Sequence, residues 1–133
     1  MEVTRTATCF CGQLSLTCVG DPVRISVCHC RDCKRRSGSA FAAQARFPAE
    51  QVTVTGRSKT WSRVSDEGNA SDFHFCPECG TTLWYNARPH HDLYAVPIGT
   101  FADPSFPPPE YSVYESRKHD WVEIVGEGID HYD

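Results

Sequence analysis

The amino-acid sequence predicts a small, mostly β protein with one short helix, held together by metal-binding cysteines. Short segments of alternating or β-branched residues recur between turn residues, which is typical of strands. Eight cysteines are present, most of them in close groups at metal-ligand spacing. With 133 residues, the chain fits one domain over residues 1–133.

The expected strands follow one another along the chain. QLSLTCV alternates, PVRISVC leads into a cysteine cluster, and DFHF and TTLWYN flank CPECG as the arms of a hairpin. In order, the strands are expected at residues 13–19, 22–28, 40–47, 51–56, 59–64, 72–75, 81–86, 92–101, 111–116 and 121–125. One helix is expected at 31–37, ended by Gly38, with loops at 65–72 and 102–110.

Two cysteine turns predict a closed metal site. CFCG (9–12) and CPECG (76–80) each place two sulfurs close in sequence, with a glycine directly after the second. Folding the backbone around a metal often needs positive φ, which glycine tolerates. Together the turns would supply four thiolates, the ligand set of a structural zinc. The expected ligands are Cys9, Cys11, Cys76 and Cys79.

Other interpretations of the cysteines stay open. They could be free core cysteines, a secreted disulfide scaffold, or, at positions 76–79, a redox pair. The scaffold is disfavoured by the clustered spacing and by a first segment unlike a signal peptide. The redox pair is expected in an α/β pattern, which this sequence lacks. Cys18 alternates with Leu14 and Leu16, so we expect it to be a small buried hydrophobe.

A third cluster, CHCRDC, predicts a metal site with a free position. Cys28, Cys30 and Cys33 lie close enough to bind one ion together, and three protein ligands with an open fourth position are typical of catalytic zinc. A closed site is the alternative, with His29, His90 or His91 as the fourth ligand. His29 is the weakest of these, because it lies between two ligands and would point away from the ion.

An open site with three thiolates favours a particular chemistry. The thiolates make zinc a weak Lewis acid, so activation of water is not its natural task. A thiol that occupied the fourth position would lose its proton and remain nucleophilic. The basic residues Arg31, Lys34, Arg35 and Arg36 could pair with carboxylates of such a thiol. For at least two of them, a solvated helix face is the simpler interpretation.

The net charge and the distribution of apolar residues restrict the kinds of partner that the protein can bind. The formal net charge is -4, so no general basic field would draw the protein to nucleic acid or to an anionic membrane. About twenty consecutive apolar residues, as a membrane span needs, do not occur. We therefore expect a cytoplasmic protein with small-molecule partners, no nucleic acid and no membrane contact. The sequence leaves open whether it forms a homodimer.

The cysteine motifs together resemble one family, the glutathione-dependent formaldehyde-activating enzymes. The resemblance rests on four segments, namely CFCG (9–12), CHCRDCKRRSG (28–38), FCPECGT (75–81) and, more loosely, VPIGTFADP (96–104). It implies a small zinc-stabilised β-tent of packed antiparallel sheets. It also implies a structural zinc on Cys9, Cys11, Cys76 and Cys79, and a catalytic, more labile zinc on Cys28, Cys30 and Cys33.

The resemblance further implies a reaction. Glutathione would take the fourth position and add to formaldehyde or a related small aldehyde. From their charge beside the cysteine loop, Arg31, Lys34 and Arg35 are the candidates for binding it. The product would be S-(hydroxymethyl)glutathione, which places the enzyme among the carbon-sulfur lyases. The alternative is a non-catalytic zinc-stabilised binding module of the same fold. Trp61, Trp84 or Trp121 would serve it if exposed, although a place in the core is the simpler expectation for each.

Overall fold

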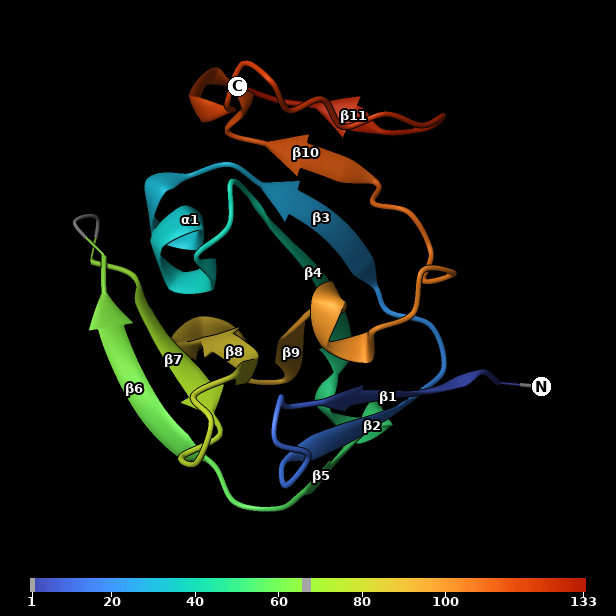
Figure 1. Ribbon diagram of the computed structural model, residues 1–133, viewed down its shortest axis with the longest axis vertical. Helices are drawn as coiled ribbons and strands as arrows, with labels where there is room; N and C mark the ends of the chain where they lie inside the picture. The colour runs from blue at the N-terminus through green and yellow to red at the C-terminus, as the bar shows by residue number, and fades with distance from the viewer. Residues whose placement is uncertain (1, 66–67) are drawn as a thin grey trace.

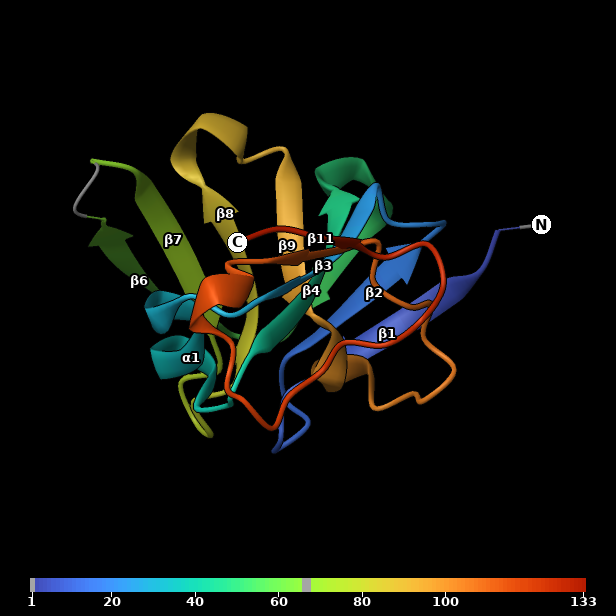
Figure 2. The same cartoon turned by 90° about the horizontal axis from the view of Figure 1, so that it is seen from above.

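Two sheets form the body of the protein in the computed structural model, which describes residues 2–65 and 68–133. One sheet has three strands in the order β1-β2-β5, and the other has eight in the order β11-β10-β3-β4-β9-β8-β7-β6. The larger sheet is curved, and β6 and β11 are its two edge strands (Figures 1 and 2). The fold is mostly β with one helix, as predicted from the sequence.

The strand bounds follow the sequence pattern closely in the middle of the chain. The strands are β1 Thr4–Thr8, β2 Ser15–Val19, β3 Arg24–Cys28, β4 Ala42–Pro48, β5 Val52–Thr55, β6 Lys59–Val64, β7 Ala70–Phe75, β8 Thr82–Ala87, β9 Leu93–Pro97, β10 Tyr111–Val113 and β11 Asp130–His131. The helix α1 is Arg31–Ser37, and short 3-10 turns lie at Ala49–Gln51 (η1), Arg88–His90 (η2), Ile98–Phe101 (η3) and Glu115–Arg117 (η4).

The core lies between the two sheets. The small sheet contributes Leu16 and Cys18, and the large sheet contributes Phe47 and Val96, all without solvent exposure. Alternate residues of a strand point to opposite faces, which places polar residues such as Gln44 and Arg46 on the other face of the large sheet. Cys18 is therefore the buried hydrophobe expected, and burial raises the pKa of its thiol to about 11.

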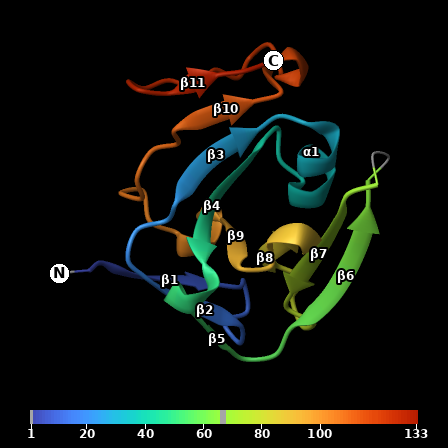
Figure 3. The ribbon, with the colours of Figure 1, turned by 180° about the vertical axis from the view of Figure 1, so that it is seen from behind.

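The helix α1 lies over this polar face, inside the curve of the large sheet (Figure 3). None of its residues is buried, so packing contributes little to its stability. Cys30 caps its first turn, since the Cys33 amide donates to Cys30 Sγ over 3.3 Å. Gly38 ends it at φ 69°, where its amide donates to the Lys34 carbonyl over 2.8 Å.

Several expected elements differ in the structure. The stretch 121–125 is not a strand, because Trp121 and Val125 are exposed and no described strand pairs with it. The expected strands at 92–101 and 111–116 end early, at Pro97 and Val113, where 3-10 turns follow. The predicted loop 65–72 already belongs to β7 from Ala70 onward, and its residues 66–67 lie outside the described part.

The sheet edges also depart from the expected pattern. The strands β1 and β11 were not predicted, and β10 pairs in parallel with both β3 and β11, whereas the other pairs are antiparallel. In the described ranges, no helix is both long and apolar enough to cross a membrane.

Candidate metal centres

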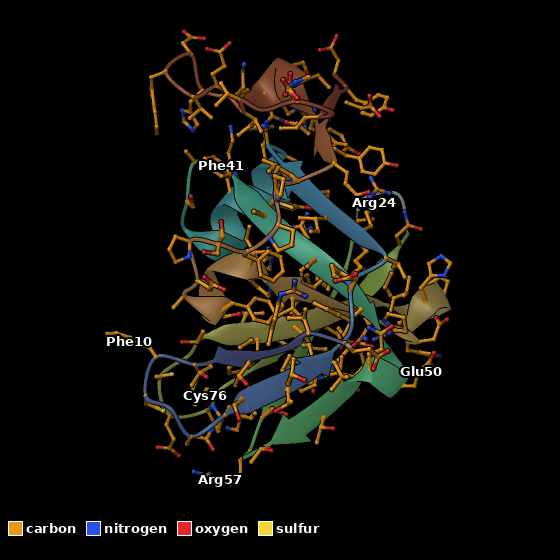
Figure 4. All side chains as sticks on the ribbon, turned by 90° about the vertical axis from the view of Figure 1, so that its right-hand side faces the viewer. Phe10, Arg24, Phe41, Glu50, Arg57 and Cys76 are labelled. Atoms are coloured by element: carbon orange, nitrogen blue, oxygen red, sulfur yellow. The ribbon has the colours of Figure 1, made fainter. Side chains whose placement is uncertain are left out.

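The first centre is built from two turns, one from each sheet. The turn after β1 and the turn after β7 bring four sulfur atoms within 4.8 Å of one another, those of Cys9, Cys11, Cys76 and Cys79. Each turn closes with a glycine at positive φ, 88° at Gly12 and 81° at Gly80. A metal ion here would therefore join the two sheets. Figure 4 shows Cys76 at this end of the molecule, with Phe10 projecting outward.

The sulfur separations fit a tetrahedral site. Cys11 Sγ lies 3.6 Å from Cys9 Sγ and 3.7 Å from Cys76 Sγ. These values exclude a disulfide, whose sulfurs are about 2.05 Å apart. Four sulfurs at about 2.3 Å from a zinc ion would be about 3.8 Å from each other. The donor set and its dimensions therefore suit a metal bound by four thiolates.

Hydrogen bonds reach three of these sulfurs, and they lower the pKa of the Cys76 and Cys79 thiols. The Leu14 amide donates to Cys9 Sγ over 3.3 Å, and the Glu78 amide to Cys76 Sγ over 3.4 Å. Thr81 hydrogen-bonds with Cys79 and lowers the pKa of its thiol to about 5. A deprotonated sulfur is the form that binds a metal.

Sequence reasoning missed Gln13, which supports this centre. Its Nε2 donates to Cys76 Sγ over 3.0 Å and to the Arg57 carbonyl over 2.7 Å, while the Arg57 amide donates back to Gln13 Oε1 over 3.0 Å. Gln13 thus fixes a ligand and ties the first turn to the β5–β6 connection. Its place two residues after Cys11 was the available signal, because residues beside a metal ligand often support it.

The second centre lies where β3 passes into α1. The sulfurs of Cys28, Cys30 and Cys33 lie within 4.8 Å of one another. Cys28 ends the strand and is buried, whereas Cys30 and Cys33 in the helix turn are partly exposed. The three sulfurs lie close together, as the sequence predicted, and solvent reaches the cluster at Cys30 and Cys33.

Two thiols of this centre, those of Cys28 and Cys33, differ in pKa. The hydrogen bond with Cys33 lowers the pKa of Cys28 to about 6, and the same bond raises the pKa of Cys33. The positive charge of Arg46 adds to the lowering at Cys28. Cys28 is therefore a thiolate near neutral pH, ready to bind a cation.

No histidine or carboxylate joins either sulfur cluster within 4.8 Å in residues 2–65 and 68–133. His29 is fully buried and points elsewhere, with Nε2 3.0 Å from Ser112 Oγ, and burial lowers its pKa. His90 lies in η2 beyond β8, with His91 directly after it. The closed alternative with one of these histidines therefore has no support in this arrangement.

The basic residues of α1 point in different directions. Lys34 Nζ donates to the Arg117 carbonyl, and Arg31 and Arg35 are exposed. Arg36, in contrast, faces the large sheet, with its guanidinium 4.8 Å from the Tyr85 ring centre. Of the three tryptophans, Trp84 is buried, whereas Trp61 and Trp121 are exposed.

The fold and its two centres define a small β protein whose cysteines could hold two metal ions. Residues 4–117 match the family model of the glutathione-dependent formaldehyde-activating enzymes, and the chain belongs to this family. An uncharacterized lyase of Schizosaccharomyces pombe is 27% identical over 77 residues, which are 58% of this chain and 53% of the yeast protein. The matched part thus spans about half the length of that relative.

A solved structure supports the fold. The crystal structure of a Rhodobacter sphaeroides protein has a TM-score of 0.57 and 19% sequence identity, covering 77% of this chain and 91% of that chain. At this identity the likeness concerns the fold alone.

Proposed function

We propose that the protein catalyses the addition of glutathione to formaldehyde or a related small aldehyde, giving S-(hydroxymethyl)glutathione. In the reverse sense this is a carbon-sulfur lyase reaction. The observation that carries the proposal is the three-cysteine centre, which has partly exposed sulfurs and, in the described residues, no fourth protein ligand. Membership of the family supports the choice of thiol and aldehyde.

Both ions are zinc in this proposal. Cys9, Cys11, Cys76 and Cys79 hold a structural ion, and Cys28, Cys30 and Cys33 hold the catalytic one. All-thiolate sets suit zinc, which needs no redox change for this chemistry. When bound, the catalytic ion supplies a position at which an added thiol loses its proton near neutral pH.

The reaction itself balances without an oxidant or reductant. A lone pair of the glutathione sulfur forms a bond to the aldehyde carbon, and the carbonyl π electrons move to oxygen. That oxygen takes up one proton, equivalent to the one that the thiol loses. In this scheme the chain binds and orients the thiol, and keeps the Cys28 sulfur deprotonated through Cys33 and Arg46.

Arg31, Lys34 and Arg35 stay candidates for binding glutathione at the outer side of α1. Arg31 and Arg35 are free to turn toward a bound carboxylate because both are exposed, whereas Lys34 would first have to release the Arg117 carbonyl. We also propose that residues 1–133 act as one cytoplasmic domain, as a monomer or a homodimer, with small-molecule partners.

A zinc-stabilised binding module is the second candidate function. The exposed Trp61 and Trp121 favour it, since exposed tryptophans are frequent at protein interfaces. Such a module would not respond to glutathione.

Cobalt substitution separates the two functions. With Co²⁺ in both centres, glutathione should increase the sulfur-to-cobalt charge-transfer absorption of wild-type protein, because a fourth thiolate joins the open centre. S-methylglutathione should not, since it offers no thiolate. An unchanged spectrum on saturation with glutathione would contradict the enzyme and favour the binding module.

A further inference from the structure

A cavity of about 270 Å³ lies on the large sheet, with Arg46, Tyr85, Ser71 and His90 among its lining residues. These residues come from β4, β8, β7 and η2, so the cavity spans several strands. They face the side of the sheet on which α1 lies, because Arg36 of α1 contacts the Tyr85 ring.

The strand register connects this cavity to the three-cysteine centre. On β3 and β4, Cys28 lies opposite Ala42, and Arg24 lies opposite Arg46 at the other end. Arg46 Nη1 reaches back to donate to Ser26 Oγ over 3.1 Å. Ser26 is two residues from Cys28 on the same face, which puts the guanidinium roughly 7 Å along the strand from the centre. In Figure 4, Phe41 and Arg24 mark the two ends of this strand pair.

Arginines outnumber carboxylates on this face, where Asp32 of α1 is already paired with Arg63. Arg24 and Arg46 are directly opposite in the register, an arrangement that costs stability when both residues carry the same charge. The ion pairs found among the described residues leave Arg24, Arg36 and Arg46 without a carboxylate partner. Arg24 rests on the Tyr111 ring at 4.6 Å instead.

Arg46 is held in place while most of its donors stay free. Ser26 Oγ accepts from both Arg46 and Gln44 Nε2, the latter over 3.0 Å. A guanidinium has five N–H groups, and only this one bond is found for Arg46 in the described residues. The half-buried Tyr85 phenol lies within the field of both Arg46 and Arg36. Desolvation raises its pKa to about 12, so it is neutral and can donate a hydrogen bond.

We propose that Arg46, aided by the charges of Arg24 and Arg36, binds a carboxylate of the thiol whose sulfur enters the three-cysteine centre. This inference rests on the proposed function and narrows its substrate class. The spacing selects a thiol with a carboxylate several bonds from its sulfur, as in a short peptide. It disfavours small mercapto acids, whose carboxylate cannot reach Arg46, and thiols without a carboxylate.

The test measures binding of S-methylglutathione to the full-length, zinc-loaded protein by calorimetry. This probe carries the carboxylates but cannot act as a thiol, so its binding does not depend on catalysis. Arg46→Gln should weaken binding about tenfold or more, because a charge-assisted hydrogen bond is lost. Arg46→Lys should restore part of it. The matched control Arg57→Gln, at an exposed arginine paired with Glu78, should bind like wild type.

The esters of the probe give a second test that needs no variant. The dimethyl ester of S-methylglutathione should bind wild-type protein about tenfold more weakly than the free acid does. Equal binding of acid and ester, or of wild type and a folded Arg46→Gln protein, would overturn the inference.

Kinetics distinguish failure of this inference from failure of the proposed function. If Arg46 controls binding but no thiol addition is accelerated, the carboxylate site stands and the proposed function fails. If addition is accelerated and Arg46→Gln leaves KM for glutathione unchanged, the function stands and the inference is overturned. We expect a higher KM in Arg46→Gln with a smaller change in kcat.

Discussion

We propose different roles for single cysteines according to the turn that holds them. Cys79 belongs to the centre that joins the two sheets, whereas Cys33 belongs to a centre at the edge of α1. Removal of a ligand from a structural site removes folding energy, but removal from an open site mainly removes chemistry. The roles of the two clusters can therefore be separated by substitution.

We predict that Cys79→Ser abolishes the native fold and that Cys33→Ser retains it. Far-UV circular dichroism and the zinc content per chain measure the outcome, with about one zinc expected to remain in Cys33→Ser. Equal unfolding of both variants would show that the division into structural and catalytic centres is wrong.

Gln13 acts on the first centre through one side-chain amide. Gln13→Ala should lower the zinc affinity of this centre by about tenfold or more, as expected for the loss of a residue that supports a ligand. Competition with a chromophoric chelator measures it. Gln51→Ala is the matched control, because Gln51 Nε2 also donates to loop carbonyls, those of Val19 and Asp21, but touches no sulfur. Equal affinities of the two variants would contradict this role.

Two turns that contain a glycine, at Gly38 and at Gly56, differ in the space available for a side chain. A Cβ at Gly38 would meet nothing within 4 Å, so only its positive φ opposes a side chain. A Cβ at Gly56, at φ 102°, would lie 2.0 Å from the Gln13 carbonyl oxygen. The turn between β5 and β6 is thus packed directly against the first cysteine turn.

Alanine at these two positions should therefore have unequal effects. We expect Gly38→Ala to lower the free energy of unfolding by about 1 kcal/mol, the cost of a left-handed conformation. Gly56→Ala should cost at least about 3 kcal/mol, since backbone must move. Chemical denaturation of the zinc-loaded proteins compares them. A Gly56→Ala protein as stable as Gly38→Ala would contradict the packing described for this turn.

The sequence pattern predicted the central strands and the helix, but not the edges. β1 reads Thr-Arg-Thr-Ala-Thr and buries only Ala7, so its apolar signal is too weak to detect. The segment 121–125 shows the opposite case, because its apolar residues find no strand to pair with. β10 joins β3 in parallel through a long connection, and pairing between distant segments leaves no local pattern.

The cysteine spacing predicted both clusters that could hold a metal ion. Spacing within each motif fixed the sulfurs that lie close in sequence, and the matching turns of Cys9–Cys11 and Cys76–Cys79 indicated that these distant segments pair. The proposed carboxylate site could not be predicted in this way. Arg46 is linked to the strand that carries Cys28 through the strand register and through Ser26, and neither relation is visible in the order of residues. The helix arginine that faces the sheet is Arg36, and spacing alone did not separate it from Arg35.

In the whole molecule, the four-cysteine centre lies where turns from the two sheets meet. Removal of its metal should unfold the protein, since structural zinc contributes on the order of 10 kcal/mol in small domains. A strong chelator should therefore abolish the far-UV spectrum of the folded state, and added zinc should restore it. Retention of native secondary structure in metal-free protein would contradict this.

In the proposed function, the three-cysteine centre activates a thiol toward an aldehyde. Exchange NMR of carbon-13 formaldehyde with glutathione tests it most directly, by comparing zinc-loaded wild type, Cys30→Ser and a sample without protein. Because the addition also occurs spontaneously, the difference in exchange rate is the informative quantity. We expect faster exchange with wild type and the spontaneous rate with Cys30→Ser. Exchange at the spontaneous rate with fully zinc-loaded wild type would contradict it.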